Sequence, residues 1–353
     1  ISRPGCLCGR AAALLMQKAA RALIEDFAVH GGRLDQARAA FPHIDEWTDL
    51  STGIAPWAYP IEPIAHSAER LPDPSALGAL EAAAAATFGA SASHVVAVPG
   101  SDLGLRMLGT ILPGRAAIVR PGYSGHATMW AERPVTACAP DAILAAAETH
   151  NALVLARPNN PDGWTAERGQ LRSAAAALAS RGGHLIVDEA FADATPADAV
   201  AGLDWPGTIV LRSFGKFFGL AGLRLGFVIA PLEICQKLRQ LIGDWPVAGP
   251  TIAAGLAAYR DTDWQAEQRA RLAASSHRMA ETLRAHGIAI VGGTDFFTLV
   301  EVPGRDALFE TLAQAGVLTR PFASAPDRLR LGLPRLDSDW TRLTWALTEW
   351  RQR

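Results

Sequence analysis

Short apolar runs alternate with alanine-rich helical stretches through the first 250 positions of the chain. Helical spacing of apolar residues covers 101–112, 166–181 and 232–242. The runs are apolar throughout rather than at every second position, which is typical of strands covered on both faces. This alternation predicts an α/β fold, with a mostly parallel mixed sheet flanked by helices. The runs predicted to be strands are 94–99, 116–121, 152–158, 184–191, 208–214 and 223–230.

The pattern changes after "WPVAGP" (245–250), where a helical stretch, 251–287, is followed by "IAIVGG", "FFTLVEV" and "DRLRLGL". These segments predict a smaller α+β lobe joined to the sheet by a long helix, so that the whole resembles a large and a small domain. The predicted divisions are an N-terminal extension (1–27), an arm packing on the small domain (28–51), a large domain (52–250), and a linking helix with a small C-terminal domain (251–353).

Composition narrows the classes of function. The net charge of −2 gives no indication of a nucleic-acid or membrane-surface partner, and no apolar run reaches the roughly 18 residues of a membrane helix. Cys6 and Cys8 form a C-x-C pair. No second Cys/His pair has ligand spacing, so no metal is expected and the thiols are predicted to be free, in a reducing cytoplasm.

One lysine, Lys216, lies among glycines and phenylalanines in "SFGKFFGLAGLRLGF" (213–227). S-x-x-K also marks serine acyl-enzymes, but the K-T-G and S-D-N motifs are missing, and a P-loop requires Ser or Thr after the lysine. The remaining chemistry is a Schiff-base lysine, whose amine is kept neutral by partial desolvation. Ser213 and Arg224 would flank this lysine as an anion site.

The same stretch resembles the cofactor-lysine motif of fold-type-I pyridoxal-phosphate (PLP) enzymes, the class I/II aminotransferase superfamily. Four further stretches agree in order: "VPGSDLGL" (98–105), "RPGYSGH" (120–126), "ARPNNPDG" (156–163) and "IVDEAF" (186–191). The resemblance implies that PLP is held by Ser101, Asp102, Tyr123, Asn160, Asp188, Ser213, Lys216 and Arg224, with Lys216 as the catalytic residue.

Each implied role has a physical reason. Asp188 would keep the pyridine nitrogen protonated by charge pairing, and a protonated ring is the electron sink of PLP chemistry. Ser101 and Asp102 open a predicted helix whose free N–H groups suit a phosphate. Because Asp102 is acidic, its backbone rather than its carboxylate would face that phosphate. Tyr123 would stack on the ring, and Asn160 would hydrogen-bond its 3′ oxygen.

Three positions depart from the family pattern. Phe191 stands where many aminotransferases have a tyrosine that donates a hydrogen bond to the cofactor 3′ oxygen. Asp162 replaces the usual threonine of the Asn-Pro turn. Leu71, in "RLPDP" (70–74), replaces a tyrosine that crosses a dimer interface to the cofactor phosphate.

The ends of the chain resemble one branch of that superfamily, the L-threonine-O-3-phosphate decarboxylases of cobalamin biosynthesis. The motifs that carry this resemblance are "HGG" (30–32), "DLSTGIAPWAYP" (49–60) and "RLRLGLP" (328–334). The resemblance implies decarboxylation to (R)-1-amino-2-propanol phosphate. Ala55 departs from the asparagine typical of this branch. The implied substrate-binding residues are His30, Gly31, Arg320 and Arg330.

Two other functions use the same fold. An aminotransferase acting on histidinol phosphate or an aromatic amino acid needs the same cofactor residues and a keto acid. A PLP-sensing regulator needs a basic helix-turn-helix domain, for which residues 1–27 are too short. The resemblance also implies a homodimer that takes a small amino acid or amino phosphate as substrate.

Overall fold

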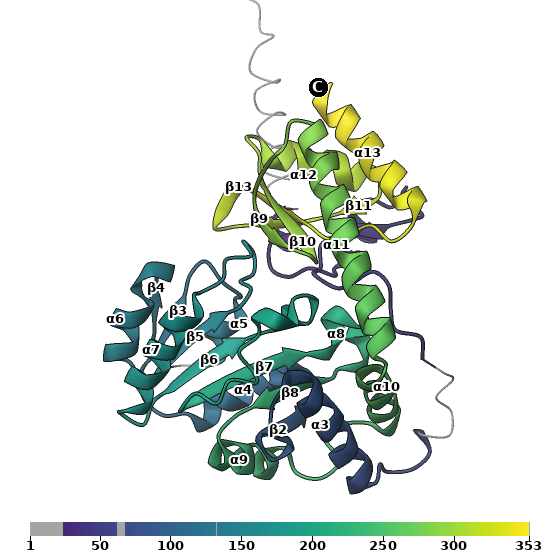
Figure 1. The fold of residues 1–353 in the computed structure, drawn as a ribbon. Helices are drawn as coiled ribbons and strands as arrows, with labels where there is room; N and C mark the ends of the chain where they lie inside the picture. Colours follow the sequence, from purple (N-terminus) through teal and green to yellow (C-terminus); the bar gives the residue numbers. More distant parts are fainter. Residues whose placement is uncertain (1–23, 62–67, 132, 353) are drawn as a thin grey trace, which may run out of the picture. The chain divides into compact units, whose positions relative to one another are not determined.

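The computed structural model describes residues 24–61, 68–131 and 133–352 (Figure 1). Two compact units are present. Unit 2 consists of Ile54–Ala274 and Gly293–Asp295, and unit 1 consists of the other described residues. Most of the predicted N-terminal extension, including Cys6 and Cys8, lies outside the described residues.

Unit 2 is built on a seven-stranded sheet in the order β2-β8-β7-β6-β5-β3-β4. Strand β8 runs antiparallel to both neighbours, β2 and β7, and the other adjacent pairs are parallel. The prediction of a mostly parallel mixed sheet is therefore confirmed. The strands are β2 (Val95–Val98), β3 (Ala116–Val119), β4 (Val135–Cys138), β5 (Ala152–Ala156), β6 (His184–Asp188), β7 (Thr208–Ser213) and β8 (Gly226–Ile229).

Helices cover both faces of this sheet (Figure 1). Along β5, Ala152 and Val154 join the core beneath α4 and α9, while Leu153 and Leu155 are buried on the opposite face. Burial on both faces explains why these strands are apolar throughout. The helices of unit 2 are α3 (Pro74–Phe88), α4 (Ser101–Ile111), α5 (Gly125–Thr128), α6 (Ile143–Thr149), α7 (Arg168–Ala179), α8 (Phe214–Phe217), α9 (Leu232–Ile242) and α10 (Gly249–Arg260). Its 3-10 turns are η2 (Ala92–His94), η3 (Pro140–Ala142), η4 (Ala192–Ala194), η5 (Pro196–Asp198) and η6 (Ala221–Leu223).

Unit 1 contains a four-stranded sheet in the order β12-β13-β10-β9, in which β10 and β12 are both antiparallel to β13. A separate two-stranded parallel sheet brings segments far apart in the sequence together, because Thr48 of β1 lies opposite Val317 of β11. The strands are β1 (Thr48–Asp49), β9 (Ala289–Thr294), β10 (Phe297–Glu301), β11 (Val317–Leu318), β12 (Arg320–Phe322) and β13 (Ala325–Leu331), with helices α2 (Leu34–Ala40), α12 (Arg305–Gln314) and α13 (Asp337–Arg351).

The helical stretch predicted over 251–287 is two helices in the structure. Helix α10 ends at Arg260, and α11 runs from Thr262 to Ala285. The carboxylate of Asp261 accepts the backbone N–H of Trp264 at 3.0 Å, which caps the start of α11. No helix among the described residues has the length and apolar character needed to span a membrane.

A buried ion cluster lies directly behind the end of β6. Arg212 of β7 is 2% exposed and donates to the carboxylates of Glu189 and Asp193, which are also buried. Burial raises the pKa of Glu189, and the charge of Arg212 opposes that rise. Glu189 also accepts the backbone N–H of Val200. The cluster therefore fixes the segment that follows Asp188 against β7.

Candidate active site

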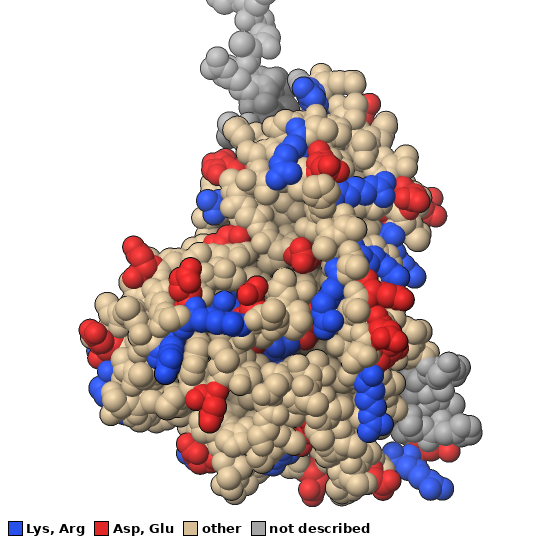
Figure 2. Space-filling model, in the orientation of Figure 1, with Lys and Arg blue, Asp and Glu red and all other residues tan. Residues whose placement is uncertain are grey.

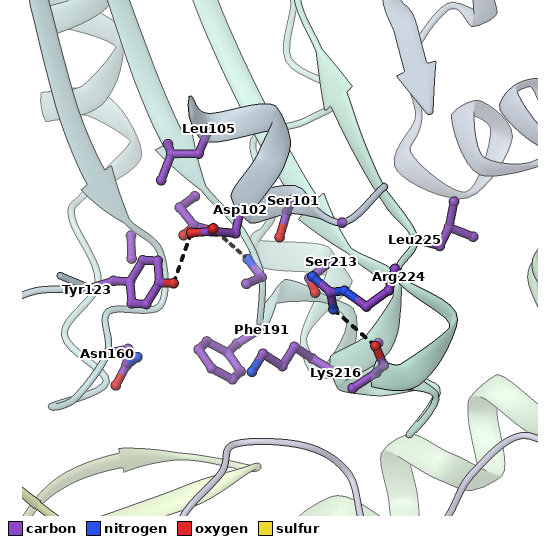
Figure 3. Close-up of a pocket in the computed structure, with 16 residues that line it drawn as sticks. Ser101, Asp102, Leu105, Tyr123, Asn160, Phe191, Ser213, Lys216, Arg224 and Leu225 are labelled. Atoms are coloured by element: carbon purple, nitrogen blue, oxygen red, sulfur yellow. Dashed lines mark hydrogen bonds between the residues drawn. The ribbon is translucent and has the colours of Figure 1, made fainter. Parts of the chain in front are cut away.

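The parallel strands of unit 2 end at one edge of the sheet, where open α/β sheets bind their ligands. The residues predicted to hold a cofactor all line one pocket at this edge (Figure 3). They are Ser101, Asp102, Tyr123, Asn160, Asp188, Ser213, Lys216 and Arg224. The structure thus brings together residues from five different connections of the sheet.

The turn between β7 and β8 supplies three of them. Ser213 ends β7, Lys216 lies in the short helix α8, and Arg224 precedes β8 with a left-handed φ of 51°. Figure 3 shows the side chains of Ser101, Ser213 and Arg224 gathered on one side of the pocket. Two hydroxyls and a guanidinium in this arrangement form a donor set for an anion.

Two glycines permit that gathering. A Cβ on Gly100 would lie 2.6 Å from a terminal nitrogen of Arg224, and one on Gly226 would lie 2.3 Å from the backbone nitrogen of Ser101. The absence of side chains lets β8 and Arg224 lie against the first turn of α4. The free N–H groups of that turn add to the donor set.

Asp188, the last residue of β6, is held by two donors. Nε2–H of His126 donates to its Oδ2 at 3.1 Å, and the backbone N–H of Ala190 donates to its Oδ1 at 3.1 Å. His126 is 1% exposed. Nothing in the sequence pairs His126 of α5 with Asp188, because the two residues lie 62 positions apart and a lone histidine carries no signal of its own.

The turn after β5 carries Asn160. Its neighbour Asn159 donates through Nδ2 to the Asp162 carboxylate at 2.8 Å and to the Pro121 carbonyl at 2.9 Å. Asp162 also accepts the N–H of Trp164 at 3.1 Å. Asp162, which departs from the family's threonine, therefore stabilises the turn as a side-chain acceptor.

Lys216 lies in partly apolar surroundings. Its Nζ is 5.7 Å from the ring centroid of Phe191, which is buried. The segment that contains Ala55 runs beside it, because the N–H of Ala55 donates to the Lys216 carbonyl at 2.9 Å. Ala55 is itself buried. The position at which this chain departs from the branch pattern is therefore a buried one next to the lysine.

In unit 1, the "HGG" segment packs on the turn that begins at Ser51. A Cβ on Gly31 would lie 2.3 Å from the Ser51 carbonyl oxygen. The N–H of Gly32, whose φ is 78°, donates to Ser51 Oγ at 2.7 Å. Ser51 Oγ in turn donates to Asp49 at 2.6 Å. Both glycines are thus required by this contact, and His30 beside them is exposed.

The two arginines predicted to bind substrate lie directly opposite each other on β12 and β13 of unit 1. Arg320 donates to the carbonyls of Phe27 and Val29 at 2.6 and 2.8 Å, and Arg330 donates to the Ser51 carbonyl at 2.9 Å. Burial, with the charge of Arg320, lowers the pKa of Arg330 to about 9. Burial lowers the pKa of Arg320 to about 10. Arg330 is buried and Arg320 is half-buried, and two like charges on facing residues favour binding of an anion.

Outside the pocket, charge is mixed on the face shown in Figure 2. Figure 2 shows acidic and basic side chains interspersed over the face drawn. Within the described ranges, no group of three or more His, Cys, Asp or Glu side chains could hold a metal ion.

The fold and the pocket agree with comparisons to known proteins. The family "Aminotransferase class I and II" matches residues 62–343, and the chain belongs to this family. Two curated relatives are each named threonine-phosphate decarboxylase. The one from Pseudomonas aeruginosa is 40% identical, covering 92% of this chain and 98% of the relative. The one from Sinorhizobium sp is 36% identical, covering 86% and 93%.

A solved structure confirms the fold independently. It is histidinol-phosphate aminotransferase from Sinorhizobium meliloti in complex with pyridoxal-5′-phosphate. The TM-score is 0.80 at 21% identity, and the match covers 90% of this chain and 94% of that one.

Proposed function

We propose that the chain is a PLP-dependent carboxy-lyase that converts L-threonine O-3-phosphate to (R)-1-amino-2-propanol phosphate in cobalamin biosynthesis. The observation that carries the proposal is the pocket in unit 2 that gathers Lys216, Asp188 and a set of anion donors. Within unit 1, Arg320 and Arg330 lie opposite each other on β12 and β13. The names of the two curated relatives support the same reaction.

The pocket fits PLP chemically. Its anion donors, Ser101, Ser213 and Arg224, suit the cofactor phosphate, and Asp188 supplies a carboxylate for the pyridine nitrogen. Lys216 lies among them and supplies the amine that bonds to the cofactor. Tyr123 and Asn160 would hold the ring and its 3′ oxygen.

When bound, PLP acts as an electron sink for the Cα of an amino acid joined to it. Both carboxylate oxygens of Asp188 accept hydrogen bonds, one from His126 and one from the N–H of Ala190. These bonds hold the carboxylate in place at the cofactor site. Lys216 in its ammonium form, or a nearby acid, would return a proton to Cα after the carboxylate leaves.

The choice of reaction depends on how the substrate is oriented, since the bond perpendicular to the cofactor ring is the one that breaks. L-Threonine O-3-phosphate carries two anions, a carboxylate and a phosphate. We assign the carboxylate to Arg330 and the phosphate to Arg320 with His30 and the backbone of Gly31. The like-charged pair, in which Arg330 is buried and Arg320 is half-buried, supports binding of a dianionic amino acid.

We also propose that the enzyme is a homodimer. In unit 2, Leu71 and Trp245 are 67% and 53% exposed, and Leu241 is 51% exposed, so large apolar side chains are available for a second copy. Sedimentation equilibrium at several protein concentrations tests this proposal, and a monomer throughout would contradict it. The cytoplasmic location stays a prediction.

The experiment that tests the function measures CO2 release from L-threonine O-3-phosphate by the PLP-loaded protein, without any keto acid. Release establishes the decarboxylase. Glutamate formation from 2-oxoglutarate and histidinol phosphate, without CO2 release, would instead establish an aminotransferase. Arg330→Ala serves as the matched control, because it should lose CO2 release while it retains PLP.

A further inference from the structure

The carboxylate of Asp102 points away from the anion donors and toward Tyr123. The Tyr123 hydroxyl donates to Asp102 Oδ1 at 3.0 Å, and Figure 3 shows this bond at the side of the pocket opposite Arg224. Burial raises the pKa of Tyr123 strongly, and the neighbouring charge of Asp102 adds to this rise. The hydroxyl therefore remains a donor at physiological pH.

The Tyr123 ring is enclosed from other directions as well. A Cβ on Gly125 would lie 2.2 Å from a ring carbon of Tyr123, so the ring occupies the space that a side chain would fill. The His126 ring meets it edge-on, with centroids 5.6 Å apart and planes at 87°. The hydroxyl bond to Asp102 fixes the remaining freedom of the ring, because it holds the far end of the side chain.

Asp102 is itself anchored by a second contact. Nε of Arg106, one turn later in α4, donates to Asp102 Oδ2 at 2.9 Å. The two carboxylate oxygens are therefore shared between Tyr123 and Arg106. The charge of Arg106 also offsets the negative charge that Asp102 places beside the anion donors of the pocket.

We propose that Asp102 is a positioning residue that holds the Tyr123 ring in place to cover a bound cofactor. Its contribution is made through its acceptor oxygen, while its backbone N–H remains part of the helix start. The proposal rests on the proposed function only in that PLP is the molecule covered. It assigns to this side chain a role separate from binding the phosphate.

The first test measures PLP affinity by titrating cofactor-free protein and following tryptophan fluorescence. Asp102→Ala and Tyr123→Phe should each weaken binding about tenfold, and the double variant should be no weaker than either alone, since both remove one hydrogen bond. Asp102→Asn keeps an acceptor oxygen and should stay within about threefold of wild type. Asp141→Ala, which removes an exposed carboxylate from η3, is the matched control.

The second test uses no cofactor. The chain has three tyrosines, so 13Cζ-tyrosine labelling gives three NMR signals, and Tyr123→Phe identifies one of them. Asp102→Ala should shift the Tyr123 signal, whereas Asp141→Ala should leave it in place. An unmoved signal overturns the proposal even if the variants fold and bind.

The outcomes separate the two ideas. Wild-type protein that binds no PLP contradicts the proposed function. Normal wild-type binding with independent losses that multiply in the double variant contradicts the role of Asp102. So does an Asp102→Asn variant that binds as poorly as Asp102→Ala, because the negative charge rather than the acceptor would then matter. Equal urea-unfolding midpoints for the apoproteins exclude a general loss of stability as the cause.

Discussion

The backbone N–H of Ala55 donates to the carbonyl oxygen of Lys216, and two residues after the lysine the Phe218 carbonyl accepts the N–H of Tyr59 in the same way. A segment near the start of unit 2 thus runs along the lysine-bearing turn and holds it by its backbone. The side chain of Gln268 adds two donors to this junction, to the carbonyls of Trp57 and Phe217.

Gly219 is required for that junction. Its φ is 66°, and a Cβ there would lie 2.8–2.9 Å from the backbone of Ala55, Trp57 and Ala58. Gly219→Ala should lower the free energy of unfolding by at least about 1–2 kcal/mol from the left-handed conformation alone. Urea denaturation of the apoprotein measures this change.

Gly78 provides the matched control. It lies in α3 with no neighbour within 4 Å of an added Cβ, so Gly78→Ala should raise the unfolding free energy by about 0.5–1 kcal/mol. Equal effects at both glycines would contradict the role given to Gly219.

Lys216→Ala should remove the visible absorbance of the purified holoenzyme, because the amine that bonds to PLP is lost. Borohydride reduction followed by peptide mass spectrometry should place the cofactor on Lys216 in wild type. Lys237→Ala, an exposed change in α9, should leave both results unaltered. A persistent absorbance band in Lys216→Ala would mean that another amine bonds to the cofactor.

Arg330→Ala should raise KM for the phosphorylated amino acid by about 100-fold or more, because a buried charge partner is removed. PLP affinity should change by less than about threefold. Steady-state kinetics and cofactor titration make the comparison, with Arg328→Ala on the same strand as control. Equal losses of substrate and cofactor binding would show that Arg330 acts only on the structure.

Arg212→Met should destabilise the protein by about 3–5 kcal/mol, because Glu189 and Asp193 would be left as buried carboxylates without their partner. Chemical denaturation measures the change. Glu281→Gln, which removes an exposed pair with His277, should cost less than about 1 kcal/mol. A loss of similar size in the two variants would contradict the importance of burial.

Cys235 should resist alkylation. Burial raises the pKa of its thiol to about 11, and a raised pKa means that the reactive thiolate is scarce until the pH approaches that value. At pH 8 about one thiol in a thousand would be ionised. Iodoacetamide treatment with peptide mass spectrometry checks this, and rapid labelling of the folded protein would contradict it. Cys138, which is half-buried, should react faster.

The sequence predicted the interior strands well, because burial on both faces leaves an unmistakable apolar run. Strand β5 was expected over 152–158 and spans Ala152–Ala156. The edge strand β4 was not predicted, since its four residues are only partly buried and carry no such run. The division at Asp261 was also missed, because an Asp-Thr pair within a helical pattern does not by itself end a helix.

The candidate site divides in the same way. Residues that lie within one motif, such as Ser213, Lys216 and Arg224, were found together because their spacing along the chain carries the pattern. Contacts between motifs were not predicted, since nothing in a single sequence says that His126 contacts Asp188 or that Tyr123 contacts Asp102. These contacts depend on strand order, which periodicity does not determine.

The reversed direction of β8 affects how the pocket assembles. Because β8 returns antiparallel to β7, with Ser213 opposite Gly226, Lys216 and two of the anion donors, Ser213 and Arg224, are carried by one hairpin. Closing a short loop costs little chain entropy, and local contacts form quickly. We expect this hairpin to form early in folding. The contact of His126 with Asp188, which spans 62 positions, must wait for the central strands to pair. The side of the pocket with Lys216 thus depends on local contacts, whereas the side with His126 and Asp188 depends on the completed sheet.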